Sequence, residues 1–541
     1  MMRDVTPRPW WRMPLIVSGV IVVPHFLFFA AVVQTFSGWL FVAAMPLAWG
    51  VCFIFFAAIR YWFVNLKHSA AFKEGYFGHM RRHGILHKAD PAALVHGSAA
   101  FAEYEGLRKS GHLEPDAEKV CRMPVFGVFP ERPAGQARFS LVGYAGKGHL
   151  LTVAPSRSGK GATQIVPNLL AWHGPAVVTD IKGENHDITQ RQRRKYGPVY
   201  ALAPFRDASD HFNPMDELDH TAPDGWEIAS LMAEMMIVSS GGKDAAFWEQ
   251  EARALLAGVI MYVACEEQGE RRTIGQVREY LSLAGEAHIA LIEAMMVHEV
   301  PQIRRAATTW CQKAPNVQGG ILATLNSQMS IWDSPKLMDM TSRSDFRFGA
   351  LKTNGHGTVY IIIPPDQIER MGPFVRLLVA LALRAMMKVP NVPGNLPVTF
   401  FLDEFTALGN MQPIQQGLLY LAGYDVRLWM FVQDMASLAN VYGDKGIESF
   451  VANAGARLFF GTNSFDTARR ISDMAGRMTV LDGSFDNPRT LGRPLIGPDE
   501  VMKMARNVGL LFIEGQPPVL VGLLPYYKTL DFEGLYDRWE G

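Results

Sequence analysis

Residues 154–162 read Ala-Pro-Ser-Arg-Ser-Gly-Lys-Gly-Ala, which is the composition of a phosphate-binding loop. An apolar run at 150–153 precedes this loop, and a helix-compatible segment follows it. In such a strand–loop–helix unit, backbone N–H groups and the helix N-terminus face the phosphates, and one lysine contacts the terminal ones. We therefore predict a nucleotide site for ATP, with the β- and γ-phosphates at Lys160, formed by Pro155, Ser156, Arg157, Ser158, Gly159, Lys160, Gly161 and Ala162.

The loop departs from the P-loop pattern at two positions. Ala154 stands where that pattern has its first glycine, and Gly161 stands where a Ser or Thr hydroxyl would bind Mg²⁺. The alternative interpretation of these residues is a Gly/Ser turn between a strand and a helix, with Lys160 in solvent.

Two adjacent carboxylates follow a second apolar run at 398–402. Ligands of open α/β sheets bind at the carboxyl ends of the strands, where Asp403 and Glu404 would lie. We predict that Asp403 holds Mg²⁺ and that Glu404 orients or deprotonates the attacking water. Acids at a strand end are often merely solvated, but a lysine loop and an acidic strand in one α/β frame together predict nucleotide hydrolysis.

Two further residues belong to the next apolar run. Gln433 ends it and is predicted to contact the γ-phosphate or its water, the alternative being an amide that faces solvent. Arg427 begins it and is a candidate arginine finger across a subunit boundary. Arg157, Arg376 and Arg457 are the competing candidates for that role.

The surrounding pattern predicts the elements that position these residues. Apolar strands alternate with helices at both ends of the region, which is typical of an α/β domain with a mainly parallel sheet. Residues 224–345 show only helical periodicity and are predicted to be an all-α insertion between two parts of the nucleotide-binding domain, 67–223 and 346–541. The segment 519–526 is predicted to be an edge strand because Pro517 and Pro518 open it.

The first 66 residues are predicted to form a transmembrane helix hairpin. Residues 13–59 contain no Lys, Arg, Asp or Glu, and two stretches, about 14–33 and 38–59, are each near the roughly 20 residues that cross a bilayer. Basic residues flank the pair on both sides, which predicts that both ends are cytoplasmic. Two buried core helices or a cleaved signal peptide are the alternatives.

Composition limits the remaining possibilities. The 541 residues carry 52 basic and 52 acidic side chains, so any nucleic-acid binding must come from local patches. The four cysteines form no C-x-x-C pair, and no metal site is predicted apart from nucleotide-bound Mg²⁺.

Taken together, these motifs resemble the coupling proteins of type IV secretion systems, the TraG/VirD-type family. Beyond the loop, the resemblance rests on His96-Gly97-Ser98-Ala99, Val166-Pro167-Asn168-Leu169-Leu170, Asp180-Ile181-Lys182-Gly183-Glu184, Phe401-Leu402-Asp403-Glu404-Phe405, Ala422-Gly423-Tyr424 and Asp466-Thr467-Ala468.

The resemblance implies a RecA-like nucleotide-binding domain in a homo-hexameric ATPase anchored in the bacterial inner membrane. Such proteins recruit a relaxase–DNA complex or effector proteins and pass them to the channel components of the secretion system. The family also tolerates glycine after the loop lysine. Two alternatives remain open: a membrane-anchored chromosomal DNA translocase of the FtsK/HerA type, and a cargo receptor that does not hydrolyse nucleotide.

Overall fold

The computed structural model of this chain describes residues 96–541, except for 115–120, 131–139, 239–242, 483–488 and 540–541. The predicted membrane hairpin, with spans near 14–33 and 38–59, lies outside the described residues. Among the helices that the structure does describe, none is both long and apolar enough to cross a membrane.

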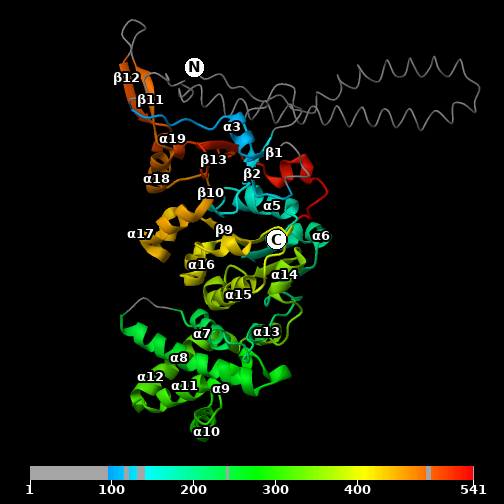
Figure 1. The fold of residues 1–541 in the computed structure, drawn as a ribbon, viewed down its shortest axis with the longest axis vertical. Coiled ribbons are helices and arrows are strands. Elements are labelled where there is room, and N and C mark those ends of the chain that lie inside the picture. The colour runs from blue at the N-terminus through cyan, green and yellow to red at the C-terminus, as the bar shows by residue number, and fades with distance from the viewer. Residues whose placement is uncertain (1–95, 115–120, 131–139, 239–242, 483–488, 540–541) are drawn as a thin grey trace, which may run out of the picture. The chain divides into compact units, whose positions relative to one another are not determined.

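A sheet of 12 strands forms the centre of the described fold (Figure 1). Seven of its strands are parallel neighbours, in the order β10 (Ala454–Phe459), β4 (His149–Val153), β9 (Val426–Val432), β8 (Val398–Leu402), β5 (Ala176–Asp180), β7 (Thr358–Ile362) and β6 (Val199–Leu202). Strands β4, β5, β7, β8 and β9 are buried along their whole length, as expected for strands covered on both faces.

The register of the central strands brings their carboxyl ends to one level. Val153 of β4 pairs with Val432 of β9, and Leu402 of β8 pairs with Met430 of the same strand. The loops that follow β4, β8 and β9 therefore begin at the same edge of the sheet.

Helices cover both faces of the parallel strands. The crossovers through α5 (Val166–Ala171) and α6 (Glu184–Tyr196) run toward β6, whereas those through α15 (Ile368–Lys388) and α17 (Met435–Asn453) run the other way. Because such crossovers are right-handed, the two pairs of helices lie on opposite faces. Figure 1 agrees for one helix of each pair, with α5 drawn above β9 and α15 below it.

An antiparallel extension continues the sheet beyond β10. It consists of β13 (Val508–Ile513), β14 (Val519–Gly522), β2 (Val125–Val128), β3 (Leu141–Gly143) and β1 (Leu113–Glu114). The prediction that the strand after Pro518 lies at an edge is wrong, because β14 lies between β13 and β2. Both prolines precede the strand, so neither removes an N–H from its ladder. A separate hairpin joins β11 (Arg477–Asp482) and β12 (Arg489–Pro494).

Between β6 and β7 the described residues form helices and no strand. These are α7 (Gly225–Met236), α8 (Lys243–Glu266), α9 (Ile274–Leu281), α10 (Gly285–Met296), α11 (Pro301–Cys311), α12 (Pro315–Met329), α13 (Pro335–Met340) and α14 (Phe348–Asn354). Helix α7 packs on α15, and Asp224 pairs with Arg384 and Lys388 of α15 at 2.7 and 3.0 Å. The helical segment is thus attached to the helix that lies between β7 and β8. The remaining helices are α3 (Tyr104–Lys109), α16 (Gln412–Gly417), α18 (Phe465–Ala475) and α19 (Pro498–Met502).

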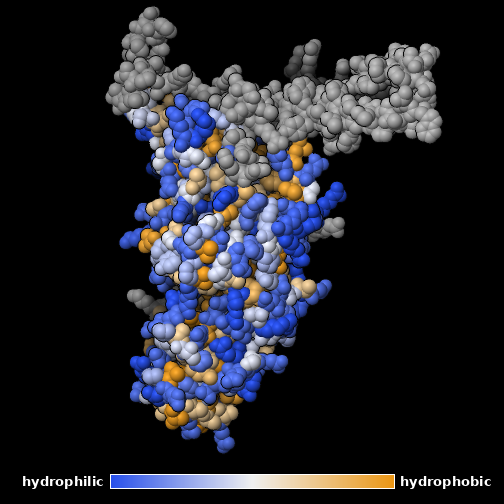
Figure 2. Space-filling model, turned by 45° about the vertical axis from the view of Figure 1, so that its right-hand side comes forward, coloured by the Kyte–Doolittle hydropathy of each residue, from blue (hydrophilic) through white to orange (hydrophobic). Residues whose placement is uncertain are grey.

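Buried aromatic side chains fill the space between the sheet and its helices. Trp429 of β9 contacts the rings of Phe126, Phe401 and Phe431, and its indole N–H donates to Thr152 Oγ1 at 2.9 Å. On the face drawn in Figure 2, by contrast, hydrophobic residues are scattered among hydrophilic ones. These large aromatic side chains are therefore part of the buried core.

Candidate active site

The loop after β4 turns sharply before its helix begins. Arg157 and Gly159 both have left-handed backbone conformations, with φ of 63° and 91°, and Ser158 N donates to the carbonyl of Pro155 at 3.2 Å. A π-helical turn, Gly161–Ile165, then leads into α5. Thr163 secures the turn, because both its N–H and its hydroxyl donate to the Gly159 carbonyl at 2.9 Å. The other N–H groups of the first helical turn have no partner within the helix, which leaves them available to an anion.

Lys160 lies between the two carboxylates that end β8. Its Nζ is 2.8 Å from Glu404 Oε1 and 3.0 Å from Asp403 Oδ1, and the residue is only 9% exposed. These contacts join residues about 244 positions apart in the sequence. The predicted phosphate-binding lysine and the predicted metal and water residues therefore lie at one place in the fold.

Burial and charge together determine how this cluster is protonated. Burial by itself lowers the pKa of Lys160, but the negative charges of Asp403 and Glu404 outweigh it, so that pKa lies above its usual value. Burial raises the pKa of Asp403, and the nearby Lys160 ammonium offsets only part of that increase. The lysine is thus a stable cation held by acids that have lost much of their hydration.

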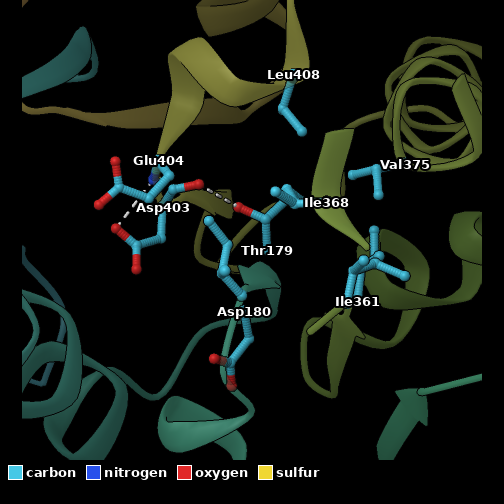
Figure 3. A pocket seen from close by; sticks show the side chains of 10 residues that line it. Thr179, Asp180, Ile361, Ile368, Val375, Asp403, Glu404 and Leu408 are labelled. Atoms are coloured by element: carbon cyan, nitrogen blue, oxygen red, sulfur yellow. Dashed lines mark hydrogen bonds between the residues drawn. The ribbon is translucent and has the colours of Figure 1, made fainter. Parts of the chain in front are cut away.

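Hydrogen bonds between side chains and backbone fix the turn after β8. Thr179 Oγ1, on the neighbouring β5, donates to the Asp403 carbonyl at 3.1 Å, and Glu404 N donates to Asp403 Oδ1 at 3.0 Å. Glu404 has a φ of 47°, a left-handed conformation that costs a non-glycine residue about 1 kcal/mol. Figure 3 shows the carboxylates of Asp403 and Glu404 pointing to the same side. Backbone strain of the kind seen at Glu404 is typical of functional positions.

Gln433 extends the cluster from the end of β9. Its side-chain Nε2 donates to Glu404 Oε2 at 3.0 Å, so that one carboxylate oxygen of Glu404 faces Gln433 and the other faces Lys160. Gln433 is exposed, unlike the strand residues before it. An amide in this position can contact both the carboxylate and a bound ligand.

Asp180 is not among the predicted site residues, although it ends β5 beside the site. Its two carboxylate oxygens accept from the N–H groups of Gly183 and His186 at 2.9 and 2.8 Å, which fixes the start of α6. Burial raises the pKa of Asp180 to about 7, and the neighbouring charge of Asp403 adds to that effect. In Figure 3 the carboxylate of Asp180 points away from Asp403 and Glu404, which indicates a supporting role. The available signal was an acid at the end of a buried strand.

The structure does not bring Arg427 into the cluster. This residue is the second of β9, at the end of the strand opposite Gln433, and is 4% exposed. Its Nη2 donates to the Gly146 carbonyl at 2.7 Å, and its guanidinium lies over the rings of Tyr144 and Trp172 at 5.9 and 5.8 Å. Burial lowers its pKa to about 10. The expectation of an arginine finger at Arg427 does not fit a side chain enclosed within its own subunit.

Comparison with known proteins gives consistent matches. The family model described as Type IV secretory system Conjugative DNA transfer matches residues 107–536. The chain is 26% identical over 459 residues to protein VirD4 of Agrobacterium fabrum, which covers 82% of this chain and 67% of that protein. It is 28% identical over 470 residues to conjugal transfer protein TraG of Escherichia coli, covering 76% of this chain and 71% of that protein.

The fold is also similar to a solved structure, the plasmid coupling protein TrwB in complex with a non-hydrolysable ATP analogue. The TM-score is 0.60 and the identity 15%, and the match covers 79% of this chain and 93% of that one. At this identity the likeness describes a shared fold.

Proposed function

Because the chain belongs to the Type IV secretory system Conjugative DNA transfer family, we propose that it is the coupling ATPase of such a system. In this role it uses ATP hydrolysis to deliver DNA or protein cargo to the secretion channel. The observation that carries the proposal is the position of Lys160 between Asp403 and Glu404, with Gln433 beside them, at the carboxyl edge of three neighbouring strands.

The phosphates of ATP bind to the loop and to Lys160. Gly159 and Gly161 of the loop supply backbone N–H groups at the start of the helix, and Lys160 supplies the positive charge. Binding therefore requires Lys160 to exchange its contacts with Asp403 and Glu404 for contacts with phosphate. The left-handed φ of Gly159 supports this assignment, because few other residues adopt it without strain.

The residues present fit a nucleotide-bound Mg²⁺. Asp403 offers a carboxylate at the strand end, and oxygen is the ligand that Mg²⁺ prefers. A Cβ added at Gly161 would meet no atom within 4 Å, so there is space beside the loop for the water ligands that Mg²⁺ usually retains. Asp403 would hold the ion, which when bound would neutralise charge on the phosphates.

Glu404 and Gln433 act on the water that attacks the γ-phosphate. Glu404 accepts or directs the proton of that water, and Gln433 contacts the γ-phosphate from the next strand. Lys160 leaves Glu404 when phosphate binds, which frees the carboxylate for this task. The cluster thus couples nucleotide binding to the release of the base.

The cellular setting is part of the same proposal. The charge-free residues 13–59 support an inner-membrane hairpin with the bulk of the chain in the cytoplasm. Within this proposal the chain forms a homo-hexamer that receives a relaxase–DNA complex or effector proteins and contacts the channel components. Membership of the Conjugative DNA transfer family supports the choice of DNA as one cargo. The alternative of an FtsK/HerA-type chromosomal translocase is not favoured by the family match.

Hydrolysis by the purified full-length protein tests the proposal. The wild type should hydrolyse ATP in the presence of Mg²⁺, faster with added DNA, and Lys160→Ala should be inactive while remaining folded. Lys336→Ala, which removes an exposed lysine from α13, is the matched control. A wild-type rate in Lys160→Ala would overturn the mechanism, and an inactive wild type would favour a receptor that does not hydrolyse nucleotide.

A further inference from the structure

A cavity of about 370 Å³ lies in the helical segment and shares no residue with the nucleotide site. It opens to solvent and is lined by residues of α7, α8 and α11, with Lys313 following α11. Its apolar walls include the indoles of Trp226 and Trp310 and the side chain of Leu255. A cavity of this size accommodates a small ligand, or a large side chain of a bound peptide together with the residues next to it.

The cavity carries one positive charge that no acid compensates. Lys313 Nζ is 2.6 Å from Glu251 Oε2, so these two lining charges neutralise each other. Arg305, the other lining cation, donates through Nε to the Pro301 carbonyl of its own helix at 3.3 Å. Its guanidinium has no carboxylate partner among the described residues.

Further donors surround Arg305 with unused capacity. Within the described part of the chain, the side chains of Gln302, Thr309 and Trp226 make no hydrogen bond, although all three line the cavity. An arginine with an amide, a hydroxyl and an indole N–H forms a set suited to an acceptor with a negative charge. The two indoles beside this set suit a large apolar group.

We propose that this cavity binds a peptide segment of a partner protein in which a carboxylate lies next to a large apolar side chain. The carboxylate contacts Arg305, and the apolar side chain packs between the indoles of Trp226 and Trp310. The carboxylate belongs either to an acidic side chain or to a chain terminus, which offer the same chemistry.

Charge distinguishes a peptide from a nucleic acid here. Residues 224–345 contain ten lysines and arginines against sixteen aspartates and glutamates. A nucleic acid gains most of its affinity from several cations that neutralise its phosphates. A cavity whose lining has one arginine without a carboxylate partner, within an acidic segment, suits a single carboxylate and repels a row of phosphates.

Fluorescence anisotropy with the full-length protein tests the site. The probes are three labelled pentapeptides: one ending in phenylalanine with a free carboxylate, its C-terminal amide, and an amidated peptide with an internal aspartate–phenylalanine pair. A labelled thymidine oligonucleotide is the fourth probe. Binding of either carboxylated peptide, but not of the simple amide, supports the proposal and identifies the source of the carboxylate.

Two substitutions with opposite expected effects on peptide affinity distinguish a change in the binding site from misfolding. Arg305→Ala should weaken peptide binding by about tenfold or more, because a charge-assisted hydrogen bond is lost. Glu251→Gln should strengthen it several-fold by releasing the charge of Lys313, and unfolding cannot produce a gain. Lys336→Ala, in the same helical segment, should leave binding unchanged.

Clear results would overturn the proposal. These are no saturable binding of any peptide, equal affinity in wild type and Arg305→Ala, or Arg305-dependent binding of the oligonucleotide without peptide binding. The site rests on its own contacts and not on the proposed ATPase activity. Lys160→Ala should therefore bind the peptide like the wild type. A failure of the peptide-binding proposal can thus be told apart from a failure of the proposed ATPase function.

Discussion

Replacing Glu404 by glutamine removes one negative charge from the cluster while keeping its shape. In the wild type, Oε1 of Glu404 faces Lys160 at 2.8 Å and Oε2 faces Gln433 at 3.0 Å. A glutamine amide can still accept from Lys160 through its oxygen, and Gln433 can rotate its own amide to accept from the new NH₂ group. The variant should therefore fold normally while lacking a base.

The expected magnitudes follow from these contacts. A positioned general base contributes about 10²–10⁴-fold, so hydrolysis should fall by at least about 100-fold. Nucleotide binding should instead become tighter, because a carboxylate that competes with phosphate for Lys160 has lost its charge. Two unit charges about 4 Å apart interact by about 4 kcal/mol at an effective dielectric constant of about 20. Asp403 still pairs with Lys160, so we expect a gain of about 1.4 kcal/mol, or tenfold in affinity.

The assay measures binding and turnover in the same preparation. Equilibrium binding of a fluorescent ATP analogue with Mg²⁺ gives the affinity, and phosphate release gives the rate. Glu293→Gln, an exposed substitution on α10, is the charge-matched control and should resemble the wild type in both measurements. Hydrolysis at the wild-type rate in Glu404→Gln would refute the role of Glu404 as a base. A loss of binding would show instead that this residue supports the loop.

Three further substitutions test neighbouring parts of the account. Gly161→Ser places a hydroxyl in open space beside the loop, so the Mg²⁺ concentration for half-maximal hydrolysis should fall several-fold; an unchanged Mg²⁺ requirement would argue against an ion at this position. Arg427→Ala removes a buried guanidinium and should lower the free energy of unfolding by about 2 kcal/mol, seen as a lower melting temperature; normal stability with activity restored by wild-type subunits would support an arginine finger instead. The pKa of Asp180 is raised to about 7 in the folded protein. Its proton therefore stabilises the fold fully below about pH 4, and this contribution is lost as pH rises through about 7. The melting temperatures of wild type and Asp180→Asn should diverge between pH 5 and 8, and parallel curves would contradict that pKa.

The strands and the site loops could be predicted from the sequence because their signals are local. Five-residue apolar runs such as 398–402 end in Asp403 and Glu404, and parallel strands place such ends at one edge of the sheet. The lysine loop and the helical segment 224–345 have local patterns of the same kind. Each of these predictions needs only periodicity and the identity of the residue at the end of an element.

The features that could not be predicted from the sequence depend on contacts between residues far apart in the chain. Arg427 is the second residue of its strand, and nothing in its neighbourhood indicates that Tyr144 and Trp172 will enclose it. The edge-strand prediction failed for the same reason, since β2 pairs with β14 across nearly 400 residues. The high pKa of Asp180 likewise arises from burial, which is a property of the assembled fold.

The most direct test of the central claim is the frequency of cargo transfer by cells in which Glu404→Gln replaces the wild-type protein. The claim is that ATP hydrolysis at the Lys160–Glu404 cluster drives delivery. It predicts that transfer falls to the level of cells lacking the protein, while the amount of the variant in the membrane fraction is unchanged. Transfer at the wild-type frequency would contradict it.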